Sequence, residues 1–149
     1  MPDWLASVWD CLFTPLQIAE DSKLLQNKKI ALQNDESIQW ESWSPQAMEK
    51  YQLTKQMVFI DFTAQWCLTC KVNDRLVLNT VAFTALAQQF ELKLLLADWT
   101  NRDPVIGEWL KNHGLVGVPA YFIQKADGKL ISLGETISIQ EIHQVLSAP

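Results

Sequence analysis

The sequence has little positive charge, and none of it is concentrated in one place. The 149 residues carry a formal net charge of −5 at pH 7, and the only adjacent basic pair is Lys28-Lys29. Proteins that bind nucleic acid neutralise many phosphates with clustered lysine and arginine side chains. The composition therefore argues against a nucleic-acid partner.

Long apolar runs and an export signal are also missing. No stretch of about 18 apolar residues occurs, so the sequence predicts no helix that spans a membrane. Asp3 stands where a signal peptide needs positive charge, and Asp10 interrupts the one short apolar stretch nearby. Six apolar residues still recur at helical spacing there: Trp4, Leu5, Val8, Trp9, Leu12 and Phe13. This stripe fits a helix packed on its own domain and equally a helix close to a membrane.

Cysteine is scarce, with three in the whole chain, too few for a scaffold held together by disulfides. We therefore interpret Cys67 and Cys70 as a working pair and leave Cys11 unpaired. An apolar content of 48% is enough for one core, and the chain is too short for two ordinary domains. Because residues 20–35 are mostly polar or charged, we expect an amino-terminal tail or linker, 1–36, and one folded domain, 37–149.

Hydrophobic periodicity and capping residues predict an α/β domain with a central mixed sheet flanked by helices. Its order is a β-α-β unit, then a hairpin, then a closing helix. The expected elements are an edge strand 37–41, a helix 45–53, a buried strand 57–63, a helix opened by the cysteine motif and continued over 71–78, a helix capped by Thr80 and ending at 89, a strand 92–97, a helix from Asp103-Pro104 to Gly114, strands 120–124 and 129–133, and a final helix opened by the capping box Ser138 to Glu141.

The most informative motif is Trp66-Cys67-Leu68-Thr69-Cys70-Lys71, directly after the buried strand. Two cysteines separated by two residues, where a strand is followed by a helix, make one thiol a nucleophile and the other its resolving partner. The amides and dipole of a helix amino terminus lower a thiol pKa from about 8.5 into the range of about 3.5–7.5. We therefore expect Cys67 to be the exposed nucleophile and Cys70 to resolve the mixed disulfide. The predicted chemistry is thiol–disulfide exchange.

Two carboxylates lie close to this motif in the sequence. Asp61 falls within the buried strand, where a charged carboxylate is costly unless it is neutral or solvated. We expect desolvation to raise its pKa and proton transfer to be its role. Asp74 follows Cys70 by one helical turn and so lies on the same helix face. For Asp74, a part in the chemistry and a solvated position on the helix surface both remain open.

Three separated motifs resemble known proteins. The run from Asp61 to Lys71, with a Val-Pro pair downstream, resembles the thioredoxin superfamily. Within it, Cys67 to Asn73, Ala97 to Asp103 and Gly117 to Pro119 together resemble the carboxy-terminal domain of the transmembrane thiol:disulfide interchange reductases, the DsbD family. The resemblance covers roughly residues 40–147 and implies a thioredoxin-like fold.

The resemblance also implies roles for individual residues. Asp61 matches a buried acid that helps to deprotonate the resolving cysteine, and Asp74 matches an acidic position where the family more often has glutamate. Pro119 matches a proline that is cis and faces the cysteines. Val118 would then offer its backbone N–H and C=O to an extended substrate segment. Trp66 is expected either to shield one side of the site and contact the partner or simply to pack.

The partners and the cellular location follow from the resemblance alone. It implies a domain of a bacterial inner-membrane protein that faces the periplasm. This domain would take electrons from a membrane-embedded partner domain and pass them to periplasmic thiol/disulfide proteins. Whether the parent protein serves disulfide isomerisation, cytochrome c maturation or defence against metal stress stays open.

Metal binding and two functions other than electron transfer to periplasmic proteins are the alternatives to this interpretation. His113 and His143 have no spacing that completes a zinc site with the cysteines, so we expect no metal and no cofactor beyond the redox-active Cys67–Cys70 disulfide. One alternative is a stand-alone oxidase or isomerase of the same fold. Another is a redox-inactive module that binds peptides and in which the disulfide is permanent.

Overall fold

A five-stranded mixed sheet lies at the centre of the computed structural model, which describes residues 38–149. Its order is β1-β3-β2-β4-β5; β1, β3 and β2 are parallel, while β4 and β5 continue the sheet antiparallel. The strands are β1 Trp40–Ser42, β2 Val58–Thr63, β3 Lys93–Asp98, β4 Ala120–Gln124 and β5 Leu130–Gly134. β2 is central and every one of its residues but the last is buried, as expected for a strand covered on both faces.

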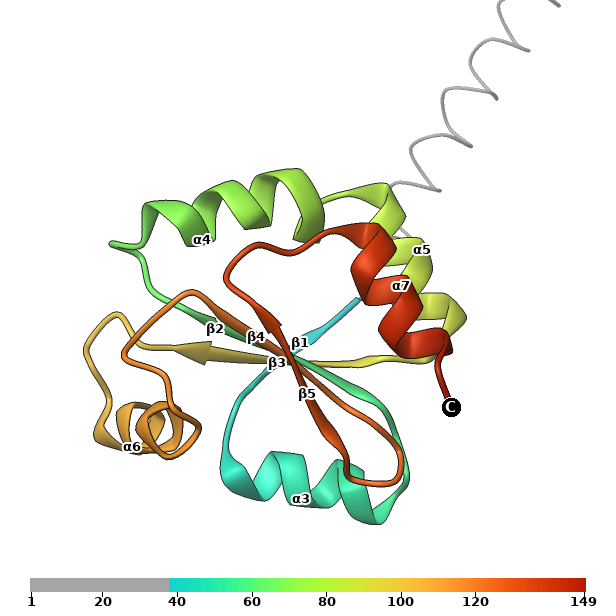
Figure 1. Cartoon of the computed structure of the whole chain (residues 1–149), viewed down its shortest axis with the longest axis horizontal. Coiled ribbons are helices and arrows are strands. Elements are labelled where there is room, and N and C mark those ends of the chain that lie inside the picture. The colour runs from blue at the N-terminus through green and yellow to red at the C-terminus, as the bar shows by residue number, and fades with distance from the viewer. Residues whose placement is uncertain (1–37) are drawn as a thin grey trace, which may run out of the picture. The chain divides into compact units, whose positions relative to one another are not determined.

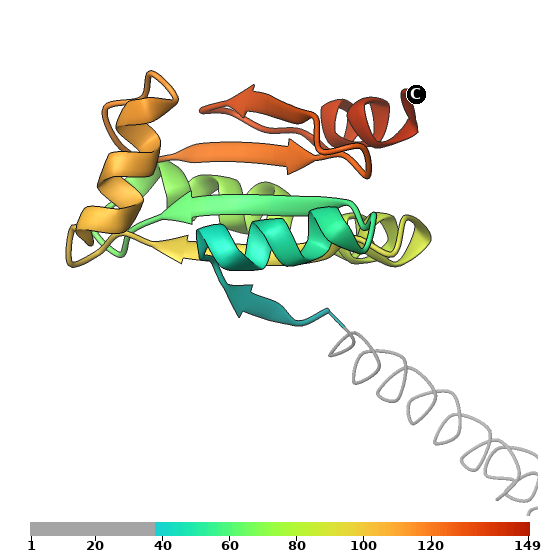
Figure 2. The ribbon, with the colours of Figure 1, turned by 90° about the horizontal axis from the view of Figure 1, so that it is seen from below.

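Helices cover both faces of the sheet. They are α3 Pro45–Leu53, α4 Leu68–Asn73, the π-helix η2 Asp74–Leu78, α5 Val81–Gln89, α6 Pro104–Asn112 and α7 Ile139–Ser147. Figure 1 shows α4, α5 and α7 on one face of the sheet, and α3 and α6 on the other. From below, α6 crosses the end of the sheet at which β2 and β3 terminate (Figure 2). The predicted α/β fold with a central mixed sheet and flanking helices is confirmed.

The predicted helix starts are confirmed by their capping bonds. The hydroxyls of Ser44, Thr80 and Ser138 each accept a backbone N–H three residues on, at 3.0, 3.2 and 3.2 Å. The Asp103 carboxylate caps α6 in a similar way, accepting Val105 N–H at 2.8 Å and Ile106 N–H at 3.4 Å. These short polar side chains satisfy amides that have no partner within the helix, which is why the sequence signals were reliable.

Two predicted elements differ clearly from the structure, whereas the others agree to within one or two residues at their ends. The edge strand lies at Trp40–Ser42 rather than at 37–41, where it pairs with β3. The expected continuous helix through residue 78 is wrong, because α4 ends at Asn73 and the chain continues as one π turn. The backbone N–H of Asn79 donates to the Asp74 carbonyl at 2.7 Å, five residues back, which closes that wider turn.

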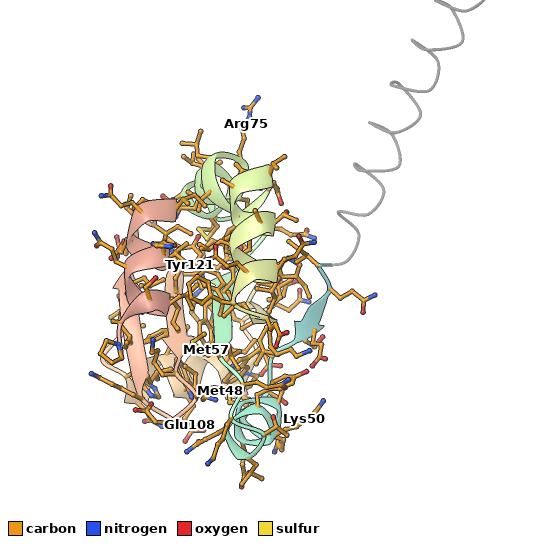
Figure 3. All side chains as sticks on the ribbon, turned by 90° about the vertical axis from the view of Figure 1, so that its right-hand side faces the viewer. Met48, Lys50, Met57, Arg75, Glu108 and Tyr121 are labelled. Carbon is orange, nitrogen blue, oxygen red and sulfur yellow. A yellow bond between two sulfur atoms is a disulfide. The ribbon has the colours of Figure 1, made fainter. Side chains whose placement is uncertain are left out.

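The two faces of the sheet have separate cores. On the face of α4, α5 and α7, hereafter the α4 face, buried residues include Phe59, Phe83 and Tyr121. On the face of α3 and α6, hereafter the α3 face, Phe62 is surrounded by aromatic rings. Figure 3 shows Tyr121 inside the molecule, between the sheet and the helices, while Arg75 projects away from it. Alternate residues of β2 therefore serve two different environments.

Several expectations lie on residues that the structure does not describe. These are the tail or linker over 1–36, its apolar stripe and the unpaired Cys11, so the division of the chain near residue 37 stays a prediction. Within residues 38–149, no helix is long and apolar enough to cross a membrane.

Candidate active site

Cys67 and Cys70 form a disulfide at the start of α4, directly after the carboxyl end of β2. Their Cα atoms are 5.3 Å apart, a separation that permits the bond without moving the backbone. Cys67 is 6% exposed and Cys70 is fully buried, so the expectation of an exposed Cys67 is wrong for this oxidised state. Cys67 is nevertheless the more accessible of the two sulfur-bearing residues.

The amino end of α4 is arranged to favour negative charge on Cys67. Cys67 is the N-cap residue, and its sulfur accepts the backbone N–H of Cys70 at 3.1 Å. When the disulfide is reduced, this amide and the positive end of the helix stabilise a thiolate at the same position. The buried surroundings of the pair are Ala64 and the partly buried Val118. Only one cysteine of the pair therefore receives the charge stabilisation of the helix terminus.

Asp61 is buried beneath α4, with 2% of its surface exposed. Desolvation, followed by the charge of Asp74, raises the pKa of Asp61 to about 7. Its Oδ1 has no hydrogen-bond partner among residues 38–149. A carboxyl group with a pKa near neutrality is suited to take up and release a proton under physiological conditions. The predicted burial and direction of the shift are both found, and proton transfer by Asp61 stays a prediction.

Asp74 is half-buried where α4 becomes η2. Burial raises its pKa, which places it among the partly desolvated groups and not on a fully solvated helix surface. Its charge reaches Asp61, so the two carboxylates discourage each other's ionisation. Two acids from different elements thus lie close enough to interact under the helix that carries Cys70.

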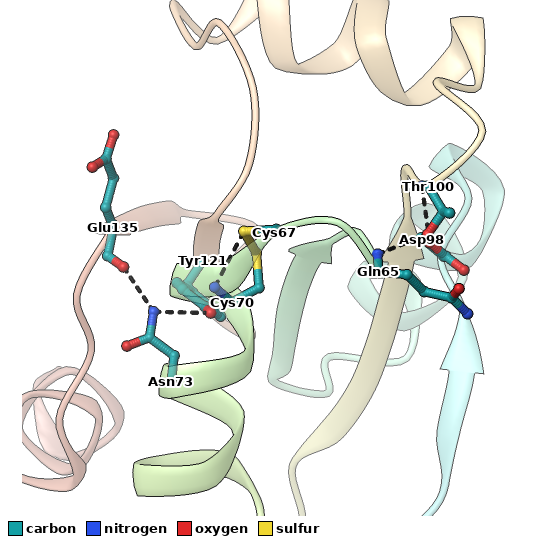
Figure 4. The surroundings of a disulfide bond; sticks show 8 residues. All are labelled: Gln65, Cys67, Cys70, Asn73, Asp98, Thr100, Tyr121 and Glu135. Atoms are coloured by element: carbon teal, nitrogen blue, oxygen red, sulfur yellow. Dashed lines mark hydrogen bonds between the residues drawn. A yellow bond between two sulfur atoms is a disulfide. The ribbon is translucent and has the colours of Figure 1, made fainter.

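Two polar residues that the sequence did not single out lie in the same layer. Asn73 is 5% exposed and Tyr121 is fully buried. The Asn73 amide donates to the Tyr121 hydroxyl at 3.1 Å and to the backbone carbonyl of Glu135 at 2.8 Å (Figure 4). Burial, and next the charge of Asp61, raise the pKa of Tyr121. The bonds join positions far apart in the sequence, so no local pattern could have identified this pair.

The peptide bond between Val118 and Pro119 is cis, as the resemblance implies. Val118 packs against the cluster of Ala64, Cys67 and Cys70. The structure therefore brings this bond next to the cysteine pair. Whether the backbone of Val118 binds a substrate segment stays a prediction.

Trp66 directly precedes Cys67 and is 48% exposed. Its indole N–H donates to the backbone carbonyl of Thr100 at 3.1 Å, and Gln65 N donates to the Thr100 hydroxyl at 2.9 Å. The guanidinium of Arg102 lies 5.0 Å from the Trp66 ring and 5.3 Å from that of Trp99. The loop after β3 thus fixes the segment before Cys67 and adds a cation to the exposed rim of the site.

Metal-ligating residues do not gather in the part of the chain that the structure describes. Across residues 38–149, no group of three or more His, Cys, Asp and Glu side chains could hold an ion. His113 lies at the end of α6, with Nδ1 2.7 Å from the Trp109 carbonyl oxygen.

The chain belongs to a thioredoxin-like family, whose sequence model matches residues 39–126. It has a thioredoxin-like oxidoreductase fold in which a Cys-x-x-Cys pair forms a disulfide. This combination indicates thiol–disulfide exchange. No curated protein matches the chain in sequence.

Solved structures show the same fold. The oxidised carboxy-terminal domain of DsbD from Neisseria meningitidis matches with a TM-score of 0.54 and 23% identity, over 70% of this chain and 94% of that one. A DsbH oxidoreductase matches with a TM-score of 0.59 and 19% identity, over 75% of this chain and 86% of that one. A thioredoxin from Thermus thermophilus matches with a TM-score of 0.53 and 19% identity, over 74% of this chain and 85% of that one. At these identities the likeness establishes the fold.

Proposed function

We propose that this domain is a protein-disulfide reductase that transfers electrons by dithiol–disulfide exchange through Cys67 and Cys70. The observation that carries the proposal is the disulfide at the amino end of α4, with the Cys70 amide donating to the Cys67 sulfur. A thiolate is the attacking species in such exchange, and this position stabilises one.

The reaction begins with the reduced pair. The Cys67 thiolate attacks one sulfur of a partner disulfide, forms a mixed disulfide, and releases a partner thiolate that takes up a proton. Cys70 then loses its proton to Asp61 and attacks the Cys67 sulfur, which restores the Cys67–Cys70 disulfide and releases the second partner thiolate. The partner disulfide gains two electrons and two protons, and the domain is oxidised. A dithiol donor reverses these steps and reduces the domain again.

The surface around Cys67 suits an extended partner segment. Leu68, on the first turn of α4, is 77% exposed, Trp66 is 48% exposed, and Arg102 adds a positive charge over the Trp66 ring. The cis peptide before Pro119 lies beside the pair, so we assign the backbone of Val118 to pairing with the segment that carries the target cysteine.

The proposed partners are a membrane-embedded electron-donor domain and periplasmic thiol/disulfide acceptors, on the periplasmic side of a bacterial inner membrane. Support comes from the three motifs that resemble the DsbD carboxy-terminal domain and from the shared fold. No cofactor enters the proposal besides the disulfide itself.

Trapping tests the exchange step. Cys70→Ser should accumulate a mixed disulfide through Cys67 with a substrate disulfide, because the resolving thiol is gone. Cys67→Ser is the matched control and should trap nothing. Equal activity of Cys67→Ser and the unmodified protein in insulin or peptide-disulfide reduction would contradict the proposal and favour a binding module.

The reduction potential tests the direction of electron flow. It is measured against dithiothreitol or glutathione buffers, with Trp66 fluorescence and thiol alkylation as readouts. A potential well below about −200 mV supports an electron donor, whereas one near about −120 mV identifies an oxidase. Since about 30 mV is a tenfold change in the equilibrium constant of a two-electron couple, the two outcomes are well separated.

A further inference from the structure

A hydrogen-bonded polar pair, Tyr121 and Asn73, lies under the redox site in the same layer as Asp61. Tyr121 and Asn73 are both buried, and neither contributes a thiol or a carboxylate to the exchange proposed above. Their neighbours on the α4 face are mainly aliphatic and aromatic. Burying polar groups in such a core is costly even when they are hydrogen-bonded to each other, so the presence of this pair needs an explanation.

Tyr121 lies directly opposite Asp61 in the sheet. The antiparallel register of β2 and β4 pairs these two residues. Side chains of directly opposed residues point to the same face, with Cβ atoms about 4.5–5.5 Å apart. The face they share is the α4 face, since Tyr121 belongs to the core that contains Phe59, two residues before Asp61. Tyr121 and Asp61 are therefore neighbours below the helix that carries Cys70.

Asn73 fixes the orientation of the Tyr121 hydroxyl. A backbone carbonyl only accepts, so the atom of Asn73 that faces the Glu135 oxygen must be Nδ2. The same nitrogen donates its other hydrogen to the Tyr121 oxygen. Figure 4 shows the amide between its two partners, which come from β4 and from the loop after β5. The Tyr121 oxygen is thus an acceptor toward Asn73, and its own hydrogen is left to point elsewhere.

The charges around Tyr121 decide where that hydrogen is most stable. Asp61 from β2 and Asp74 from η2 both act on Tyr121, and Cys70 precedes Asn73 on α4. Neither α5 nor β5 carries a titratable side chain. Lys71 of α4, Arg75 of η2 and His143 of α7 are exposed, and Glu141 of α7 is half-buried. The charges that act on the hydroxyl are therefore negative, and a hydroxyl dipole aligns its hydrogen toward them.

We propose that Tyr121, oriented by Asn73, is a positioning residue of this site, whose hydroxyl dipole favours the ionised form of Asp61 and so keeps Asp61 able to accept the Cys70 proton. The effect on Cys70 rests on the proposed exchange function, whereas the effect on the ionisation of Asp61 can be measured without it. Donation by Asn73 polarises the phenol and strengthens the dipole that it presents to the carboxylate. Removing the hydroxyl also leaves Asp61 in a more apolar environment, and both effects disfavour its charge.

The test is the titration of the Asp61 carboxyl carbon by NMR in the oxidised protein, with Asp61→Asn to assign the signal. Tyr121→Phe should raise the pKa of Asp61 from about 7 by about 0.5–1 unit. Tyr51→Phe is the matched control, because Tyr51 is also buried and loses a bond to Glu41, but on the α3 face. It should leave the titration of Asp61 unchanged.

A second variant tests the orientation. Asn73→Ala retains the hydroxyl but frees it to turn, so it should raise the pKa of Asp61 by less than Tyr121→Phe does. Combined with Tyr121→Phe, Asn73→Ala should add little, because the two residues act through one dipole. An unchanged or lowered pKa of Asp61 in Tyr121→Phe would overturn the proposal, and so would full additivity of the two variants.

A kinetic readout separates this inference from the exchange function. The resolution of a mixed disulfide formed on Cys67 should reach its half-maximal rate at higher pH in Tyr121→Phe, with the same plateau at alkaline pH. If the unmodified protein catalyses no exchange while the Asp61 titration still shifts, the exchange function fails and the positioning role stands. If exchange proceeds and neither the titration nor the pH midpoint moves, the positioning role fails.

Discussion

The same strands contribute side chains of different kinds to the two faces of the sheet. On the α3 face, Phe62 of β2 stacks on Trp109 with ring centroids 4.8 Å apart and meets Trp43 at 5.3 Å. On the α4 face, the preceding residue of the same strand is a buried carboxylate, and β4 places a hydrogen-bonded tyrosine opposite it. Both faces bury aromatic rings and some polar atoms, but the α4 face also buries a carboxylate close to the disulfide.

This contrast shows where chemistry is located in a fold that is mostly packing. Aromatic rings at these distances stabilise by packing, and on the α3 face the cluster extends to His113, whose ring stacks on Trp109 with centroids 3.7 Å apart. Asp61, by contrast, is less stable when charged, a penalty that fits the proton transfer proposed for it near neutral pH. Variants on the two faces should therefore differ in kind as well as in size.

The largest expected effect comes from the aromatic cluster. Phe62→Ala should lower the free energy of unfolding by about 3–5 kcal/mol, because it opens a cavity among rings that cannot fully collapse. Urea denaturation at constant pH measures this. The Asp61 titration should stay in place, and a shifted pKa would show that the two faces are coupled.

Ionisation of Asp61 has the next largest effect. Its pKa is raised from 3.8 to about 7, so the folded protein binds this proton more tightly than the unfolded chain does. The associated stability is fully present below about pH 4 and is lost as the pH rises through about 7, a total of about 4 kcal/mol. Asp61→Asn should gain that amount over the unmodified protein between pH 4 and pH 8, as measured by denaturation of the oxidised forms. A constant difference across this range would contradict the raised pKa.

Removal of the second carboxylate should act more weakly. Asp74→Asn eliminates a negative charge that raises the pKa of Asp61, so that pKa should fall by less than about one unit. Desolvation is the larger cause and remains. Carboxyl NMR measures the shift, with Glu108→Gln on the exposed side of α6 as a charge-matched control. A rise in the pKa of Asp61 would show that the negative charge of Asp74 does not repel the ionised Asp61 carboxylate.

The smallest expected effect lies on the rim. Arg102→Ala removes a guanidinium from above Trp66 and Trp99, a contact worth about 0.5–1 kcal/mol at an exposed site. The rate of exchange with a peptide disulfide should change by only a few fold, while the reduction potential stays constant. Arg75→Ala, which removes an exposed charge from η2, is the matched control. A potential altered by Arg102→Ala would place this residue in the chemistry and not on the docking surface.

The sequence predicted most of the fold because its signals are local. Ser44, Thr80, Asp103 and Ser138 each satisfy amides within three residues, so the helix starts were readable. The end of α4 was not, since apolar and polar residues continue at helical spacing into η2. A π turn depends on which backbone carbonyl the next amide reaches, and tertiary packing decides that.

The site was predictable as far as one motif extends. Cys67, Cys70 and the buried acid at Asp61 follow from spacing and from the strand around them. Tyr121 and Asn73 were missed because their bond joins residues 48 positions apart, and nothing in either local sequence marks them as polar partners. Thr100, which holds Trp66, was missed for the same reason.

The π turn at η2 also bears on how this helix tolerates insertion and deletion. A bond from Asn79 to Asp74 encloses one residue more than an α-helical bond does, so the segment carries one residue beyond what an uninterrupted helix needs. Arg75 and Leu76 are exposed within it, while Val77 and Leu78 are buried in the core. In a lineage of related chains, this is where a single-residue deletion could restore a regular helix and keep the following core residues facing inward.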